Sequence, residues 1–284
     1  MIRLHRKRAA NVLHRNFGRD KIDEFEEELL LNQRKISRNE LEKHLWVSSR
    51  WKAAKEQLLE ESEKKCGYCE VPTSVVSYGD VEHYRPKSIY WWLAYSYENY
   101  VASCTICNQK YKSASFPIVN ALLPAPNVRA EMTDDEILDL VGTLAPNSLS
   151  RADIEQFTRM HMDERPLILN PYFDEPKEFI GWEADATKEE VALIPLPENP
   201  LSERVCASLK ENLGLNRIEL LELRWQVYEG YWTLRLAIDD PGISRQTQVR
   251  IDSKLKKLKE GKSIFAGMIR YFDEKRFEDL EAPI

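Results

Sequence analysis

Two closely spaced pairs of cysteines constrain this chain more than any other feature of its sequence. Cys66 and Cys69 form the first pair, and Cys104 and Cys107 form the second. The Cys-x-x-Cys spacing places two thiolates on one tight turn, and two such turns can close a tetrahedral Zn²⁺ site. The 34 residues between the pairs exceed the spacing of a simple zinc ribbon, so this segment must fold as a unit of its own. We therefore predict one structural zinc ion bound by the four cysteines.

The composition is that of an ordinary globular protein, with 43% hydrophobic and 31% charged residues in a chain of 284. No apolar run approaches the ~20 residues needed to span a bilayer. The basic N-terminus lacks the apolar stretch of a secretory signal. We therefore expect a cytoplasmic protein without a membrane partner, in which paired cysteines bind metal rather than form disulfides. Cys206, the fifth cysteine, is expected to be a buried small side chain.

The net charge of −6 argues against a surface that attracts nucleic acid uniformly. Any binding of nucleic acid must therefore use local basic patches or a partner. Basic residues also gather near both ends of the chain, between Arg3 and Arg19 and between Lys254 and Lys259. Charged segments of this kind are usually solvated, so we assign them no function.

Sequence periodicity divides the chain into three regions, and together they predict a mainly α fold of the α+β class. Residues 1–64 form an N-terminal helical region with two or three helices. Residues 65–120 form a compact module that carries the zinc site. The β-branched residues that predict short strands in this module are Val71, Val75, Val76 and Val81. Residues 121–284 form an acidic linker, a small β element and a C-terminal helical region.

Two local patterns give more specific structural expectations. Ser37 followed by Glu40 has the capping-box spacing of a helix N-terminus. The apolar runs at 167–171 and 191–194 predict strands of a small hairpin or sheet.

The segment between the cysteine pairs carries an acid–histidine pair, Glu82 and His83, and then Asn99, while Asn108 directly follows the last cysteine. This pattern resembles the HNH endonucleases, in which zinc knuckles bracket a ββα-metal motif. More narrowly, it resembles the PtuB-like HNH nucleases of Septu and retron-associated anti-phage systems. The strings that carry the resemblance are Cys66-Gly-Tyr-Cys69, Glu82-His83-Tyr84-Arg85-Pro86-Lys87, Trp92-Leu93-Ala94-Tyr95, Asn99-Tyr100, Ser103-Cys104, Cys107-Asn108, Lys112, Phe116-Pro117, Pro166-Leu167-Ile168-Leu169-Asn170-Pro171, Leu213-Gly214-Leu215-Asn216-Arg217 and Arg224.

The resemblance implies a role for each polar residue of the motif. Phosphodiester hydrolysis needs a base for the water and positive charge on the phosphate, and His83 can supply the base. Glu82 and Asn108 are expected to hold a catalytic Mg²⁺ or Mn²⁺, with Asp80 as a nearby substitute, because hard cations prefer oxygen ligands. Asn99 is expected to orient His83 or to pin the loop.

Basic and aromatic side chains surround this motif. The basic residues that are candidates for binding flanking phosphates are Arg85, Lys87, Lys110 and Lys112. The aromatic residues of the same segment are Trp91, Trp92, Tyr95 and Tyr97. Aromatic side chains can stack on bases, but beside a small zinc module they more often form its core, which we favour.

The resemblance therefore implies a metal-dependent HNH endonuclease that acts on DNA, or on RNA such as tRNA, as an effector of bacterial defence. It implies a PtuA-like ATPase partner of the ABC or SMC type and, in retron-linked versions, a reverse transcriptase and its msDNA. The first alternative is a catalytically silent zinc module that binds nucleic acid or scaffolds a complex. The second is a thiol oxidoreductase, which needs a reactive cysteine at a helix N-terminus in a βαβ setting that the sequence does not display.

Overall fold

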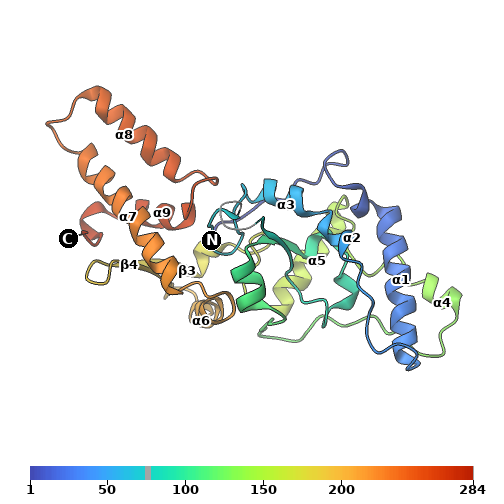
Figure 1. Ribbon diagram of the computed structural model, residues 1–284. Helices are drawn as coiled ribbons and strands as arrows, with labels where there is room; N and C mark the ends of the chain where they lie inside the picture. The colour runs from blue at the N-terminus through green and yellow to red at the C-terminus, as the bar shows by residue number, and fades with distance from the viewer. Residues whose placement is uncertain (74–77, 284) are drawn as a thin grey trace.

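The computed structural model describes residues 1–73 and 78–283, so Val75 and Val76 lie outside the described residues. The described chain is mostly helical and carries two small two-stranded sheets, which confirms the predicted fold class (Figure 1). The helices are α1 (Arg19–Ser37), α2 (Ser48–Lys52), α3 (Lys55–Glu61), α4 (Asp134–Leu138), α5 (Arg151–Glu164), α6 (Ser202–Leu213), α7 (Ile218–Ile238), α8 (Arg245–Leu258) and α9 (Ala266–Asp273). The strands are β1 (Asp80–His83), β2 (Tyr100–Ser103), β3 (Ile180–Asp185) and β4 (Glu190–Pro195). Within the described ranges, no helix has the length and apolar character that a bilayer crossing requires.

Three helices lie in the N-terminal region, as the periodicity predicts. α1 buries Ile22, Phe25 and Leu29, which lie on one face at helical spacing. The predicted N-cap at Ser37 is wrong, because Ser37 is the last residue of α1 and its hydroxyl donates to the carbonyl of Gln33 at 3.1 Å. A serine inside a running helix can bond the carbonyl four residues earlier, which removes the reason for a new helix start.

The zinc module has a ββα arrangement. β1 and β2 pair antiparallel with His83 opposite Tyr100, and the π-helical segment η5 (Ile106–Lys112) follows β2. The first cysteine turn lies against β2, where the Gly67 amide donates to the carbonyl of Ala102 at 2.8 Å. A Cβ at Gly67 would lie 2.9 Å from the Val101 side chain, so glycine allows this close approach.

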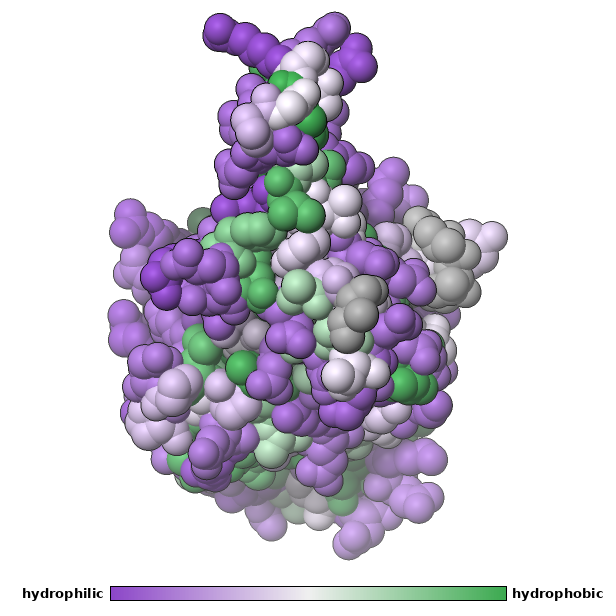
Figure 2. All heavy atoms as spheres, turned by 90° about the vertical axis from the view of Figure 1, so that its left-hand side faces the viewer, coloured by the Kyte–Doolittle hydropathy of each residue, from purple (hydrophilic) through white to green (hydrophobic). Residues whose placement is uncertain are grey.

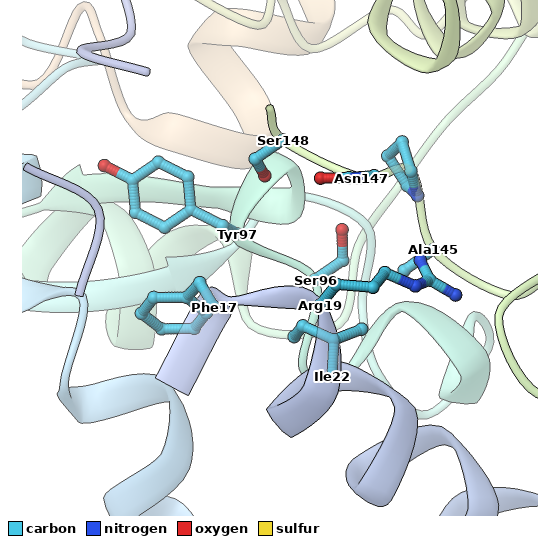
Figure 3. Close-up of a pocket in the computed structure, with 9 residues that line it drawn as sticks. Phe17, Arg19, Ile22, Ser96, Tyr97, Ala145, Asn147 and Ser148 are labelled. Atoms are coloured by element: carbon cyan, nitrogen blue, oxygen red, sulfur yellow. The ribbon is translucent and has the colours of Figure 1, made fainter. Parts of the chain in front are cut away.

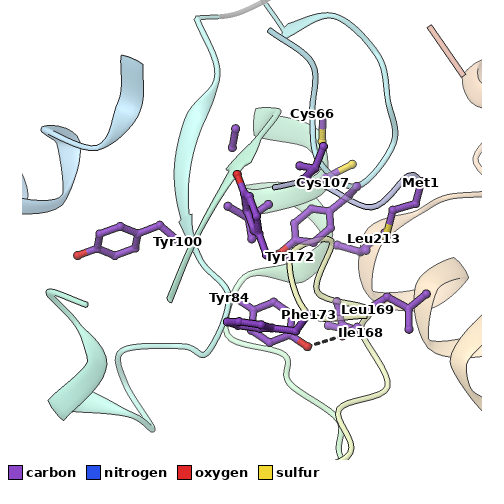
Figure 4. Packing of buried hydrophobic residues seen from close by; sticks show 14 of the residues in the cluster. Met1, Cys66, Tyr84, Tyr100, Cys107, Ile168, Leu169, Tyr172, Phe173 and Leu213 are labelled. Carbon is purple, nitrogen blue, oxygen red and sulfur yellow. Dashed lines mark hydrogen bonds between the residues drawn. The ribbon is translucent and has the colours of Figure 1, made fainter. Parts of the chain in front are cut away.

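Residues 167–171, predicted as a strand, instead form a buried irregular segment under the zinc module (Figure 4). Their backbone groups bond outside any sheet: Tyr84 donates its hydroxyl to the Ile168 carbonyl at 2.5 Å, and the Leu167 amide donates to Pro117 at 2.8 Å. The strand prediction is wrong here because buried apolar runs need not belong to a sheet once other groups satisfy their backbone. The hairpin prediction at 191–194 is confirmed by the β3–β4 pair.

The C-terminal region packs α6 and α7 on the β3–β4 hairpin, and α9 packs on β3. α7 and α8 run side by side as a helical hairpin at the opposite end of the molecule from α1 and α4 (Figure 1). Figure 2 shows this hairpin rising above the rest of the surface. The zinc module therefore lies between an N-terminal helical part and a C-terminal part with its own hairpin sheet.

Candidate active site and zinc centre

The four predicted zinc ligands converge. The sulfur atoms of Cys66, Cys69, Cys104 and Cys107 all lie within 4.8 Å of one another, and all four residues are buried. The Cys69 and Cys104 sulfurs are 4.0 Å apart. Zn–S bonds of about 2.3 Å in a tetrahedron require sulfurs roughly 3.8 Å apart, whereas a disulfide requires about 2.05 Å. The cluster therefore fits a four-thiolate zinc site, while Cys206 lies outside it, buried in α6.

His83 ends β1, and its ring is held in one orientation. The ring packs edge-on against Trp51 and Tyr100, with centroids 5.0 and 5.2 Å away. Its Nε2 lies 2.9 Å from the carbonyl oxygen of Ala94. Because a carbonyl only accepts, Nε2 must carry the proton, which leaves the Nδ1 lone pair free in the neutral ring. Burial lowers the pKa of His83 to about 3, helped by the charge of Lys87, so the ring is neutral at neutral pH.

His83 lines a cleft of about 520 Å³ together with Glu82 and Asn108. Trp51 and Lys87 form another part of its wall. Three of the four residues predicted to be catalytic thus meet at one hollow of the surface.

A second cavity, drawn in Figure 3, lies where residues 145–148 cross the start of α1. Phe17, Arg19 and Tyr97 line it. Its volume is about 10 Å³, which holds at most one water molecule. It is therefore a packing gap rather than a substrate site.

Carboxylates on one face of β1 turn toward η5. Glu82 Oε1 forms an ion pair with Lys112 Nζ at 2.5 Å, and Asp80 Oδ2 accepts a hydrogen bond from Asn108 Nδ2 at 3.3 Å. Alternate residues of a strand share a face, which brings the Asp80 and Glu82 carboxylates to the same side of β1. Burial raises the pKa of Glu82, and the charge of Lys112 opposes that rise.

A catalytic ion at this place would have oxygen atoms of Glu82, Asn108 and Asp80 as its candidate ligands, and Lys112 occupies one of them. Glu82 Oε1 is buried and already lies 2.5 Å from Lys112 Nζ, so a divalent ion must displace the lysine or share this oxygen with it. Mg²⁺ commonly binds through one or two carboxylates and keeps several waters, which matches Glu82 with Asn108 and Asp80. In the described ranges, the cysteine cluster is the one group of three or more His, Cys, Asp or Glu side chains arranged to hold a metal.

Asn99 is fully buried, and the hydrogen bonds of its side chain all go to backbone groups. Its Oδ1 accepts from the Arg85 amide at 2.8 Å, and its Nδ2 donates to the carbonyls of Arg85 and Leu93 at 3.0 and 3.2 Å. These bonds tie the loop after His83 to the turn that presents Ala94. Asn99 thus lies where it can position His83 through the loop, without lining the cleft.

Arg85 does not lie where the sequence prediction needs it. Its side chain is fully buried, and its Nη2 pairs with Glu164 Oε2 at 2.7 Å. The same nitrogen lies 3.4 Å from His161 Nδ1, and the guanidinium stacks over Phe157 with its carbon 5.1 Å from the ring centroid. Phosphate contact by Arg85 therefore does not fit the structure. The sequence signal for this network is the helical i,i+3 spacing of His161 and Glu164.

Lys112 is also fully buried. Its Nζ pairs with Glu82 and donates to the His83 carbonyl at 3.1 Å, so the buried ammonium has partners within the site. Its charge acts inside the site rather than on flanking phosphate. Lys87 is half-buried at the cleft and Lys110 is exposed on η5, so these two remain candidates for phosphate contact. The aromatic residues Trp91, Trp92, Tyr95 and Tyr97 are buried, as expected for core.

Replacing Arg85 with alanine is expected to destabilise the protein by roughly 3–5 kcal/mol, because Glu164 is left as a buried, unpaired charge. The free energy of unfolding measured with urea gives this value. Lys110→Ala, at an exposed position, is the control and should leave stability within about 0.5 kcal/mol of the parent. An Arg85→Ala protein of parental stability but weaker nucleic-acid affinity would return Arg85 to the phosphate contacts.

Comparison with known proteins finds two relatives over part of the chain. Septu protein PtuB of Bacillus mycoides strain KBAB4 is 42% identical over 69 residues, which is 20% of this chain and 23% of that protein. Septu protein PtuB of Bacillus thuringiensis is 38% identical over 79 residues, which is 26% of this chain and 31% of that protein. The chain thus matches less than a third of the length of either relative. No family model and no solved structure matches it.

Proposed function

We propose that this chain, which is PtuB-like over part of its length, is a metal-dependent endonuclease of the HNH type. The observation that carries the proposal is the position of His83. Its Nε2 is fixed by Ala94, its Nδ1 lone pair is free, and it lines one cleft with Glu82 and Asn108. A neutral, oriented histidine beside oxygen ligands is the arrangement that phosphodiester hydrolysis requires.

In this proposal His83 Nδ1 removes the proton from the attacking water. The Ala94 carbonyl stabilises the imidazolium that forms, since its oxygen already accepts from Nε2. Glu82 and Asn108 would hold a divalent ion here, and that ion would supply positive charge for the phosphate and the departing oxygen. Lys87 is placed at the cleft to contact a flanking phosphate. The zinc ion has a structural role, because four thiolates leave no open coordination position.

The biological setting follows from the partial homology with PtuB. We propose that the chain is an anti-phage effector that works beside a PtuA-like ATPase, and in retron-linked versions beside a reverse transcriptase and its msDNA. The acidic net charge of −6 suits a nuclease whose access to DNA or RNA is controlled by such a complex.

The test is cleavage by the purified protein, alone and with a PtuA-like ATPase. Double-stranded DNA, single-stranded DNA and total tRNA are each incubated with Mg²⁺, with Mn²⁺ and with EDTA. Ion-dependent cleavage of at least one substrate is expected. Absence of cleavage under every condition, in protein that contains zinc, would overturn the proposal.

One observation favours a second candidate, the catalytically silent zinc module. Lys112 already neutralises Glu82, so a divalent ion must displace the lysine or share the carboxylate with it. In a silent module this ion pair is permanent. The protein would then bind nucleic acid or hold a complex together, and added Mg²⁺ or Mn²⁺ would change neither its stability nor its activity.

Asn108→Ala is expected to slow cleavage roughly 100-fold or more, because the ion loses a ligand and ion binding supplies several kcal/mol of charge stabilisation. Higher Mn²⁺ concentration should recover part of the rate. Glu82→Gln should behave similarly, with Asp80 replacing part of the lost charge. Rates measured across a series of Mn²⁺ concentrations give the effect.

The control for this prediction is Asn120→Ala, which removes an exposed asparagine outside the cleft. It should cleave at the parental rate. If Asn108→Ala matched the parent at every ion concentration, Asn108 would not be an ion ligand.

A further inference from the structure

Arg224 of α7 is a buried cation that forms no direct ion pair with the described residues. It is 1% exposed, and no ion pair joins it to any acidic side chain within the described ranges. Its Nη1 makes long contacts with the Val191 carbonyl at 3.5 Å and Asn216 Oδ1 at 3.4 Å, and its Nε has no hydrogen-bond partner. Burial lowers the pKa of Arg224 to about 10, and the charges of Cys69, Glu70 and Cys107 oppose that fall.

Arg217, which precedes α7, touches the cysteine cluster directly. Its Nη1 lies 3.8 Å from Cys107 Sγ and donates to the Gly214 carbonyl at 3.1 Å. The side chain is 9% exposed, and Glu219, at 4.0 Å, is itself largely in solvent. A solvated carboxylate at that distance gives little stabilisation, so the sulfur is the principal anionic contact of Arg217.

A buried cation without a counter-charge is strongly unfavourable, and so is a buried anion. One Zn²⁺ with four thiolates carries two negative charges, and two arginines carry two positive ones. We infer that Arg217 and Arg224 are the counter-cations of the zinc centre, and that they make its metal affinity depend on the C-terminal helices. The inference rests on the zinc site of the proposed function, not on nuclease activity.

The backbone brings the α6–α7 corner close enough for this role. Gly214 ends α6 with a φ of +60°, and a Cβ there would lie 2.4 Å from the ring of Tyr111. Tyr111 belongs to η5, four residues after the zinc ligand Cys107. Only a glycine allows this contact, which holds the corner against the second cysteine turn. Zinc binding and docking of α6 and α7 are therefore expected to stabilise each other.

The experiment compares zinc retention in the zinc-loaded protein of residues 1–284 and in its variants. Arg217→Gln and Arg224→Gln remove the charges, whereas Arg217→Lys and Arg224→Lys keep them. Arg235→Gln is the matched control, since Arg235 lies on the same helix but pairs with Asp273 at 3.3 Å. The measurements are zinc content, the rate of zinc transfer to a coloured chelator, and hydrogen exchange in α6 and α7.

We expect both glutamine variants to lose zinc affinity by about 10- to 100-fold, as is typical when an outer contact of a metal ligand is removed. The lysine variants should fall between these and the parent, and Arg235→Gln should match the parent. Chelation of zinc should raise hydrogen exchange in α6 and α7.

Zinc release at the parental rate from folded Arg217→Gln and Arg224→Gln would overturn the inference. If a glutamine variant does not fold, the lysine variant at the same position is the test. Lysine keeps the positive charge, so a folded lysine variant that loses zinc as readily as a protein without that charge would overturn the inference. A parent protein without zinc would instead overturn the zinc site itself, which is a distinguishable result.

Discussion

Replacing His83 with alanine is expected to slow phosphodiester cleavage by ~10²–10⁴-fold, the usual contribution of a positioned general base. The bond from Nε2 to Ala94 fixes the tautomer, so Nδ1 is the atom that can accept the proton of water. No other histidine lines this cleft. The loss should therefore appear in the rate at saturating substrate, measured with labelled DNA or RNA.

The zinc content of the His83→Ala protein should equal that of the parent, because the four cysteines lie on other segments. Loss of the ring contacts with Trp51 and Tyr100 is expected to cost ~1–3 kcal/mol, which a stable domain tolerates. His5→Ala, at an exposed histidine, is the control and should cleave normally. Parental cleavage by His83→Ala, in a preparation free of contaminating nuclease, would leave the silent zinc module as the better account.

The cysteine site could be predicted because its information is local. Each Cys-x-x-Cys pair specifies its own tight turn, and two such turns in one chain are more typical of a zinc site than of any other role for four thiols. His83, Glu82 and Asn108 were candidates because their pattern around the cysteines resembles the HNH endonucleases, and their catalytic roles stay a prediction. The structure brings them to one cleft because β1 ends at His83 and η5 begins two residues after Cys104.

The roles of the basic residues could not be predicted, because sequence gives the charge of a side chain but not its burial. Arg85 pairs with Glu164, 79 residues away, and Lys112 pairs with Glu82 across the ββα unit. Lys110, two residues before Lys112, is exposed. Two lysines that are close in the sequence thus differ in burial, one in solvent and one in the interior. Only the tertiary packing determines which of them is buried.

The same limit applies to the counter-cations of the zinc centre. Arg217 and Arg224 stand in strings that resemble the PtuB-like nucleases, yet their sequence positions lie more than a hundred residues from Cys107. Neither the φ of Gly214 nor the contact with Tyr111 is visible in the sequence. A contact between a helix corner and a metal cluster depends on how α6 and η5 pack, which no local pattern encodes.

Replacing Cys104 with serine is expected to unfold the zinc module and abolish every activity that depends on it. A structural zinc contributes about 10–16 kcal/mol in small zinc domains, which is comparable to the whole stability of ~5–15 kcal/mol of a typical protein. Cys104 lies in the two-residue connection between β2 and η5, so loss of its metal bond is expected to release the strand pair from the helix that carries Asn108. Zinc content, near-ultraviolet circular dichroism and cleavage should all fall together.

Cys206→Ser is the matched control, because Cys206 is equally buried but lies in α6, outside the cluster, where its thiol contacts the Leu193 carbonyl at 3.7 Å. A serine hydroxyl can make the same contact, so this variant should retain zinc and fold. Since the two substitutions remove the same atom from buried sites, their difference isolates the metal. A stable, zinc-free Cys104→Ser protein with full activity would exclude a structural role for zinc in this fold.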